Sequence, residues 1–111
     1  MKIYTKLGDQ GQTSIYTGAR FKKHSLIINA IGNIDELSSY LGLVRATIKK
    51  DKKIDQILHD VQYDLYKITN NLAGAEVKFD EKNVGYLEKV IDVYNDELPN
   101  IKSFIIPSGH K

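Results

Sequence analysis

The chain has 111 residues, which is enough for one small domain with an apolar core of modest size. Its 16 Lys and Arg residues against 14 Asp and Glu residues give a net charge of +2, too small for a protein that binds nucleic acid mainly by electrostatic attraction. There is no cysteine, which excludes disulfides, thiolate catalysis and cysteine-bound zinc. No apolar run approaches the roughly 20 residues that span a bilayer, so we expect a soluble, cytoplasmic protein without a membrane or nucleic-acid partner.

The first segment, from Met1 to about Ile31, is rich in Gly, Thr, Ser and Lys. It contains two short β-like pieces, Lys2 to Thr5 and Thr13 to Tyr16. Glycines and hydroxyl residues around these pieces are typical of turns. The pattern therefore predicts a largely irregular N-terminal segment.

The stretch TKLGDQGQTS, from Thr5 to Ser14, allows two interpretations. The simpler one is a β-hairpin whose strands are joined by the residues from Gly8 to Gly11. The functional one accepts the hairpin and adds an anion-binding concavity, formed by backbone N–H groups that Gly8 and Gly11 allow to converge. Hydroxyl groups and positive charges would then surround a polyphosphate, and they come from Thr5, Thr13, Ser14, Lys6, Arg20, Lys22 and Lys23. Neither the Walker spacing nor G-x-G-x-x-G is present, so the residues alone leave both interpretations open.

A helix is predicted to begin at Asn33, which can act as N-cap with Glu36 in capping-box register. Asp35 and Glu36 would then lie in the first turn, where negative charge is favourable. One helical face follows at three- and four-residue spacing, formed by Ile34, Leu37, Leu41, Val44 and Ile48.

Two more amphipathic helices are predicted, from Ile54 to Leu72 and from Val84 to Leu98. The lysine-rich run Lys49 to Lys53 is interpreted as a solvated connection before the first of them, and Pro99 ends the second because proline cannot continue a helix. Three such helices with short connections predict an all-α, antiparallel helical bundle. The histidines share no metal-ligand spacing, so no metal site is predicted.

Three blocks, IYTKLGDQGQTSIYTG (Ile3–Gly18), AIGNIDELSSYLG (Ala30–Gly42) and LPNIKSFIIPSG (Leu98–Gly109), resemble the ATP:cob(I)alamin adenosyltransferases of the propanediol-utilisation type. The resemblance implies a ferritin-like, up-down bundle of five helices that assembles as a homotrimer. It also implies a single domain over residues 1–111 that is incomplete at its C-terminus, with a nucleotide-binding loop segment (1–31) and part of the helical bundle (32–111). The arginine-bearing helix of the family would follow Gly109, so we expect a fragment or a truncated form.

The resemblance implies transfer of the 5′-deoxyadenosyl group of ATP to cob(I)alamin, which releases triphosphate and forms adenosylcobalamin. ATP is then the co-substrate, cobalamin the substrate and Mg²⁺ an expected cofactor, and a reductase or a cobalamin-dependent acceptor enzyme is a further partner. A non-catalytic nucleotide- or corrinoid-binding module and a purely structural helical assembly protein remain the alternatives.

The resemblance also assigns site residues. The family's ATP-contacting positions are matched by Thr5, Lys6, Leu7, Gly8, Thr13, Ser14 and Lys23. Asp35 matches an aspartate that pairs with an arginine across the subunit interface, and Phe104 matches a phenylalanine that closes off the lower face of the corrin. The chain departs from the family at Leu7, where threonine is frequent, and at Asn29, where an acidic residue is common.

Overall fold

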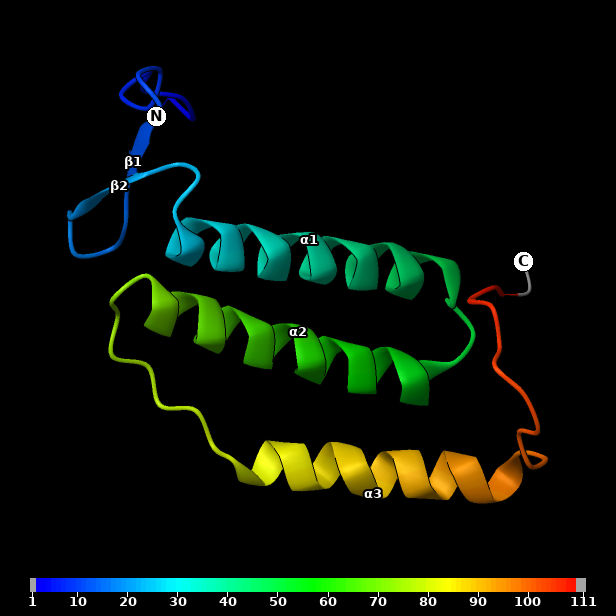
Figure 1. Ribbon diagram of the computed structural model, residues 1–111. Helices are drawn as coiled ribbons and strands as arrows, with labels where there is room; N and C mark the ends of the chain where they lie inside the picture. The colour runs from blue at the N-terminus through cyan, green and yellow to red at the C-terminus, as the bar shows by residue number, and fades with distance from the viewer. Residues whose placement is uncertain (1, 110–111) are drawn as a thin grey trace. The chain divides into compact units, whose positions relative to one another are not determined.

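The computed structural model describes residues 2–109 and is mostly helical (Figure 1). Its elements in chain order are β1 (Gln12–Ser14), β2 (Arg20–Lys22), α1 (Leu26–Thr47), α2 (Lys52–Leu72) and α3 (Lys82–Glu97). The chain forms two compact units, Met1–Phe79 and Asp80–Lys111. The predicted helical class is confirmed, whereas the division at residues 31 and 32 stays a prediction. Between residues 2 and 109, none of the helices combines the length and the apolar character that a membrane crossing requires.

The N-terminal hairpin differs from the predicted one. Strands β1 and β2 pair in antiparallel register, with Thr13 opposite Phe21. The turn between them is closed by hydrogen bonds from Ile15 N–H to the Ala19 carbonyl and from Gly18 N–H to the Ile15 carbonyl, both 2.9 Å long. The prediction that the Gly8 to Gly11 stretch joins the strands is therefore wrong, as is the strand predicted at Lys2 to Thr5. A strand as short as β2 has no alternating apolar pattern from which it could be recognised.

Helix α1 begins earlier than predicted. Its N-cap is Ser25, which has an extended backbone, and the helix starts at Leu26 rather than at Asn33. The capping-box pattern of Asn33 and Glu36 lies inside the helix, because the apolar residues from Leu26 to Ile31 extend its face toward the N-terminus. The expectation that Asp35 and Glu36 occupy the first turn is therefore wrong.

Helices α1 and α2 form an antiparallel pair (Figure 1). The predicted apolar face of α2 is confirmed, since each of its members is partly buried: Ile54, Ile57, Leu58, Val61, Leu65, Ile68 and Leu72. Asp51 caps the start of α2 by accepting a 3.0 Å hydrogen bond from Ile54 N–H. The lysine-rich run is thus divided, because Lys52 and Lys53 belong to the first turn of α2.

A polar network, which we call the α1–α2 clasp, joins the two helices through Arg45, Asp55, Gln62 and Ser38. Arg45 Nε donates to Asp55 Oδ1 at 2.7 Å, and Arg45 Nη1 donates to Gln62 Oε1 at 2.8 Å. Gln62 Nε2 donates in turn to the Ser38 carbonyl at 2.8 Å. The hydrogen bond and charge of Arg45 lower the pKa of Asp55, and the same hydrogen bond raises the pKa of Arg45.

The C-terminal unit contains α3 and an irregular tail. Helix α3 ends at Glu97, and Leu98 has an extended backbone (ψ 150°), as expected for the residue before a proline. The sequence predicts that this helix runs to Leu98 and stops before Pro99, and its observed end at Glu97 confirms this to within one residue. From residue 98 to residue 109 the chain has neither helix nor strand.

Candidate functional site

The loop before β1, residues 5–11, makes two tight turns. Asp9 N–H donates to the Lys6 carbonyl and Gly11 N–H donates to the Gly8 carbonyl, both at 3.3 Å. Lys6 has φ 63° and Gly11 has φ 80°. A left-handed backbone costs a non-glycine residue about 1–2 kcal/mol, so the loop holds Lys6 in an unfavourable conformation. The Gly11 amide is thus used within the loop, and the anion-binding interpretation of the loop stays a prediction.

Thr5 and Leu7 contribute mainly to the shape of this loop. The Thr5 hydroxyl accepts a 3.4 Å hydrogen bond from Leu7 N–H. The Leu7 carbonyl accepts a 2.9 Å bond from Arg20 Nη2, which also lies 3.5 Å from the Gln12 carbonyl. Arg20 therefore ties the beginning of the loop to its end.

Lys23 reaches the loop at Gly8. The Lys23 backbone N–H donates to the Gly11 carbonyl at 2.9 Å, which places this residue at the end of the hairpin beside the loop. A Cβ atom on Gly8 would lie 3.3 Å from Lys23 Nζ and 3.2 Å from the Gln12 carbonyl oxygen. A side chain at this position would have to displace the end of Lys23 or the Gln12 carbonyl by a few tenths of an ångström, so the absence of a side chain at Gly8 favours the approach of the ammonium group to the loop. Lys23 thus lies beside the glycine loop, and its contact with a ligand stays a prediction.

A cleft, which we call the hairpin cleft, opens between the hairpin, α1 and the end of α2, with a volume of about 370 Å³. Its lining residues are Thr13, Ser14, Ile15, Tyr16, Ile28, Ile31, Gly32, Asp35 and Ala73. The structure thus brings together three predicted site residues, Thr13, Ser14 and Asp35. Thr5, Lys6, Leu7, Gly8 and Lys23 do not line the cleft and belong to the preceding loop and the end of the hairpin. Hydroxyl groups, one carboxylate and an apolar wall can bind a small ligand with polar and apolar parts.

Sequence reasoning missed several residues of this site. Arg20 was expected only as a nearby charge, whereas its guanidinium group holds backbone carbonyls. Ile28 and Ile31 lie in the segment for which the sequence predicts irregular structure, whereas in the structure they belong to α1 and line the cleft. Their spacing of three residues was the available signal, because it continues the apolar face of the predicted helix upstream.

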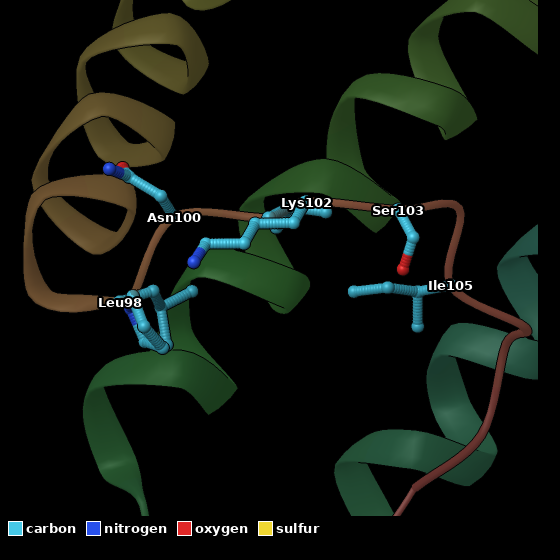
Figure 2. A pocket seen from close by; sticks show the side chains of 7 residues that line it. Leu98, Asn100, Lys102, Ser103 and Ile105 are labelled. Carbon is cyan, nitrogen blue, oxygen red and sulfur yellow. The ribbon is translucent and has the colours of Figure 1, made fainter.

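Phe104 lies in the C-terminal unit and is 94% exposed. Next to it, a hollow of about 290 Å³ is lined by the residues from Leu98 to Ser103 and by Ile105. Figure 2 shows the Lys102 side chain extending toward Leu98 and the Ser103 hydroxyl pointing toward Ile105. Phe104 itself is not part of this lining, so its ring is available to a partner or ligand rather than used in packing within its own unit.

Similarity to known proteins extends over nearly the whole chain. The family model described as cobalamin adenosyltransferase matches residues 3–111. The chain belongs to this family. It is 38% identical over 118 residues to the corrinoid adenosyltransferase of Bacillus subtilis, an alignment that covers 100% of this chain and 61% of that protein. It is 38% identical over 121 residues to the corrinoid adenosyltransferase of Mus musculus, covering 99% of this chain and 51% of that protein.

The solved structures agree with the family assignment. A variant of the PduO-type ATP:corrinoid adenosyltransferase from Lactobacillus reuteri, complexed with cobalamin and ATP, matches with a TM-score of 0.89 and 32% identity. The match covers 99% of this chain and 65% of that one. The chain therefore spans between about half and two thirds of the length of these members of the cobalamin adenosyltransferase family, and the resemblance inferred from its three blocks is confirmed.

Proposed function

We propose that the chain binds ATP at the loop of residues 5–11 and in the hairpin cleft, as part of an ATP:corrinoid adenosyltransferase. The observation that carries this proposal is the position of the Lys23 ammonium against Gly8, at the end of a hairpin whose residues Thr13 and Ser14 line the cleft. Lys6 adds a second positive charge to the same loop. The Lactobacillus reuteri structure of the same fold was determined with ATP and cobalamin, which supports this choice of ligand.

The proposed reaction is attack of cob(I)alamin on C5′ of ATP. The cobalt supplies the electron pair of the new Co–C5′ bond, the C5′–O bond breaks, and triphosphate leaves with the bonding electrons. Because Co(I) is itself a strong nucleophile, the protein has to align the reactants and to stabilise the leaving anion. Lys6 and Lys23 would bind the triphosphate, and the apolar wall of Ile28 and Ile31 would exclude water from the nucleoside end.

Mg²⁺ is proposed as a companion of the nucleotide. Over residues 2–109 no group of three or more His, Asp or Glu side chains is arranged to hold a metal ion. Mg²⁺ commonly binds through substrate phosphates and retains several waters. We therefore expect it to reach this site bound to the triphosphate oxygens, and no step of the proposed reaction depends on a protein cage for it.

Phe104 is proposed to cover the lower face of the corrin. Its 94% exposure supports this, because the ring is free to contact a ligand. Truncating a core phenylalanine costs about 3–5 kcal/mol of stability, whereas a change at an exposed position usually stays within ~0.5 kcal/mol. Phe104→Ala should leave the melting temperature and ATP affinity nearly unchanged and alter the optical spectrum of bound cob(II)alamin. A large drop in melting temperature with an unchanged spectrum would show that Phe104 is a packing residue instead.

We also propose that the chain works as a homotrimer in which Asp35 faces a neighbouring subunit, where it would pair with an arginine of the helix that follows Gly109 in the family. Among the described residues no side chain is fully buried, and Leu37, Tyr40 and Leu43 leave α1 with an exposed apolar surface. Burying such surface is the main driving force for association. Sedimentation of the 111-residue chain tests the assembly. A cytoplasmic location and a reductase that supplies Co(I), or an acceptor enzyme that takes up adenosylcobalamin, complete the proposal.

The deciding experiment combines ATP calorimetry with a triphosphate-release assay in the presence of ATP and chemically reduced cob(I)alamin. Binding with triphosphate release supports the transferase. Binding without release, under conditions in which the Bacillus subtilis enzyme is active, favours a non-catalytic nucleotide-binding module. Absence of both would favour a structural helical protein and would overturn the proposal.

A further inference from the structure

The turn of the hairpin touches the end of α2 at one glycine. Gly74 follows α2 directly after Ala73 and has φ 94°. A Cβ atom on Gly74 would lie 2.5 Å from Thr17 Cγ2, a distance at which one of the two groups must move. The Thr17 Cβ and Oγ1 atoms would be 3.7 Å away, within ordinary contact distance. The close approach therefore involves a single methyl group of Thr17 and the missing side chain of Gly74.

This contact lies at one end of the hairpin cleft. Thr17 directly follows the lining residues Ile15 and Tyr16, and Gly74 directly follows the lining residue Ala73. Figure 1 shows the hairpin at the same end of the helix pair as the C-terminus of α2. The contact between Thr17 and Gly74 therefore joins the segment that forms the hairpin wall of the cleft to the segment that contributes Ala73.

Gly74 is itself held firmly by the last turn of α2. Ala73 N–H donates to the Thr69 carbonyl at 2.9 Å, and Gly74 N–H donates to the Asn71 carbonyl at 3.0 Å. The hairpin turn is closed by its own two hydrogen bonds at Ile15 and Gly18. Two locally rigid pieces therefore meet at one point, so an added methyl group displaces one piece relative to the other instead of being absorbed between them.

We propose that Gly74 is a positioning residue for the nucleotide site: its missing side chain lets the hairpin turn dock on α2, which places Thr13 and Ser14 across the cleft from Asp35. The identity of the ligand rests on the proposed function, whereas the docking contact does not. The competing explanation is that Gly74 serves only to end α2, since a left-handed glycine after the C-cap is a common helix stop.

A double-mutant cycle on Gly74 and Thr17 separates the two explanations. Gly74→Ala adds both the backbone strain and the clash with Thr17, while the pair Gly74→Ala with Thr17→Ser keeps the strain and removes the clashing methyl group. Thr17→Ser alone is the matched control. The readouts are amide chemical shifts and hydrogen exchange of the hairpin, residues 12–22, together with ATP affinity by calorimetry.

We expect Gly74→Ala to shift the hairpin amides, to speed exchange at Ile15 and Gly18 by about tenfold, and to weaken ATP binding by about tenfold, the size of effect typical of an overpacked contact. Thr17→Ser alone should stay near wild type, and the double variant should recover most of each loss. A double variant as impaired as Gly74→Ala, or hairpin amides unaffected by Gly74→Ala, would overturn the proposal. If the wild-type chain does not bind ATP but the hairpin amides follow the cycle, the positioning role stands and the proposed function fails.

Discussion

The α1–α2 pair and the loop with its hairpin are built in different ways. The helix pair combines regular backbone hydrogen bonds with the α1–α2 clasp, in which each polar group finds a side-chain or carbonyl partner. The loop and hairpin depend on isolated turns and on Arg20, and they contain Lys6, Gly11 and Gly18, all with positive φ. Left-handed backbone is therefore frequent where the candidate ligand site lies, and at Lys6 it is unfavourable because the residue is not glycine, as is common at functional sites.

The largest effect that separates the two regions is expected from Lys23. Lys23→Ala removes an ammonium group that lies against the loop backbone at Gly8. Because a hydrogen bond to a charged group contributes about 1.5–3 kcal/mol, ATP binding should weaken by roughly tenfold or more. Calorimetry on the variant measures this loss directly.

The matched control is the double variant Lys49→Ala with Lys50→Ala, in the connection between α1 and α2. It removes positive charge from a solvated part of the helix pair. If ATP affinity falls as much in this control as in Lys23→Ala, general electrostatic attraction would explain the binding, and the loop would have no special role.

The helices were predictable because the sequence pattern that specifies them is local and periodic. The α2 face could be read from apolar residues three and four positions apart, and Pro99 ended α3 as expected. The start of α1 was missed because Asn33 and Glu36 imitate a capping box inside a longer helix. Capping residues indicate where a helix is able to begin, and an apolar face that continues upstream can override them.

The loop region was less predictable because its geometry depends on contacts between distant residues. Nothing in the local sequence indicates that Arg20 donates to the Leu7 carbonyl, 13 positions away. The same holds for Thr17 and Gly74, which are far apart in the sequence and approach each other only in the tertiary structure. The family resemblance names the residues of the candidate site as a group, and their binding roles stay predictions. The structure adds which of them shape the loop and which line the hairpin cleft.

A second, smaller effect concerns the backbone of Lys6. Glycine adopts φ 63° without steric cost, although it loses more entropy on folding. Lys6→Gly should therefore leave the free energy of unfolding unchanged or raise it by up to about 1 kcal/mol, while Lys6→Ala keeps the strain. Both variants lose the ammonium group, so both should bind ATP more weakly than wild type.

Chemical denaturation of the two Lys6 variants measures the effect of the backbone conformation on the free energy of unfolding, and calorimetry measures the effect of the lost charge on ATP affinity. A Lys6→Gly variant that retains wild-type ATP affinity would show that the loop needs only the left-handed backbone at this position. A Lys6→Gly variant that is more stable than wild type but binds ATP more weakly would show that the strained backbone at Lys6 is retained because the ammonium group contributes to ATP binding.

The smallest expected effect lies in the helix pair, at Asp55. Arg45 lowers the pKa of this carboxyl below its ordinary value of 3.8, chiefly through the hydrogen bond between the two side chains. A group whose pKa is lower in the folded state adds stability above its unfolded pKa and loses it as the pH falls through the folded value. Lowering the pH from 3.8 downward should therefore weaken the α1–α2 clasp, and wild type should lose stability faster than Asp55→Asn.

Because other carboxylates also titrate in this range, the informative quantity is the difference in free energy of unfolding between wild type and Asp55→Asn at each pH. That difference should be constant above the ordinary pKa and shrink below it, since protonated Asp55 and asparagine are both neutral. Arg45→Gln in each background is the matched control, because it should remove most of the pH dependence of the difference. A difference that stays constant down through pH 3.8 and below would mean that the contact between Arg45 and Asp55 does not persist in solution, and the helix pair would then be held by its apolar face and the remaining hydrogen bonds of the clasp.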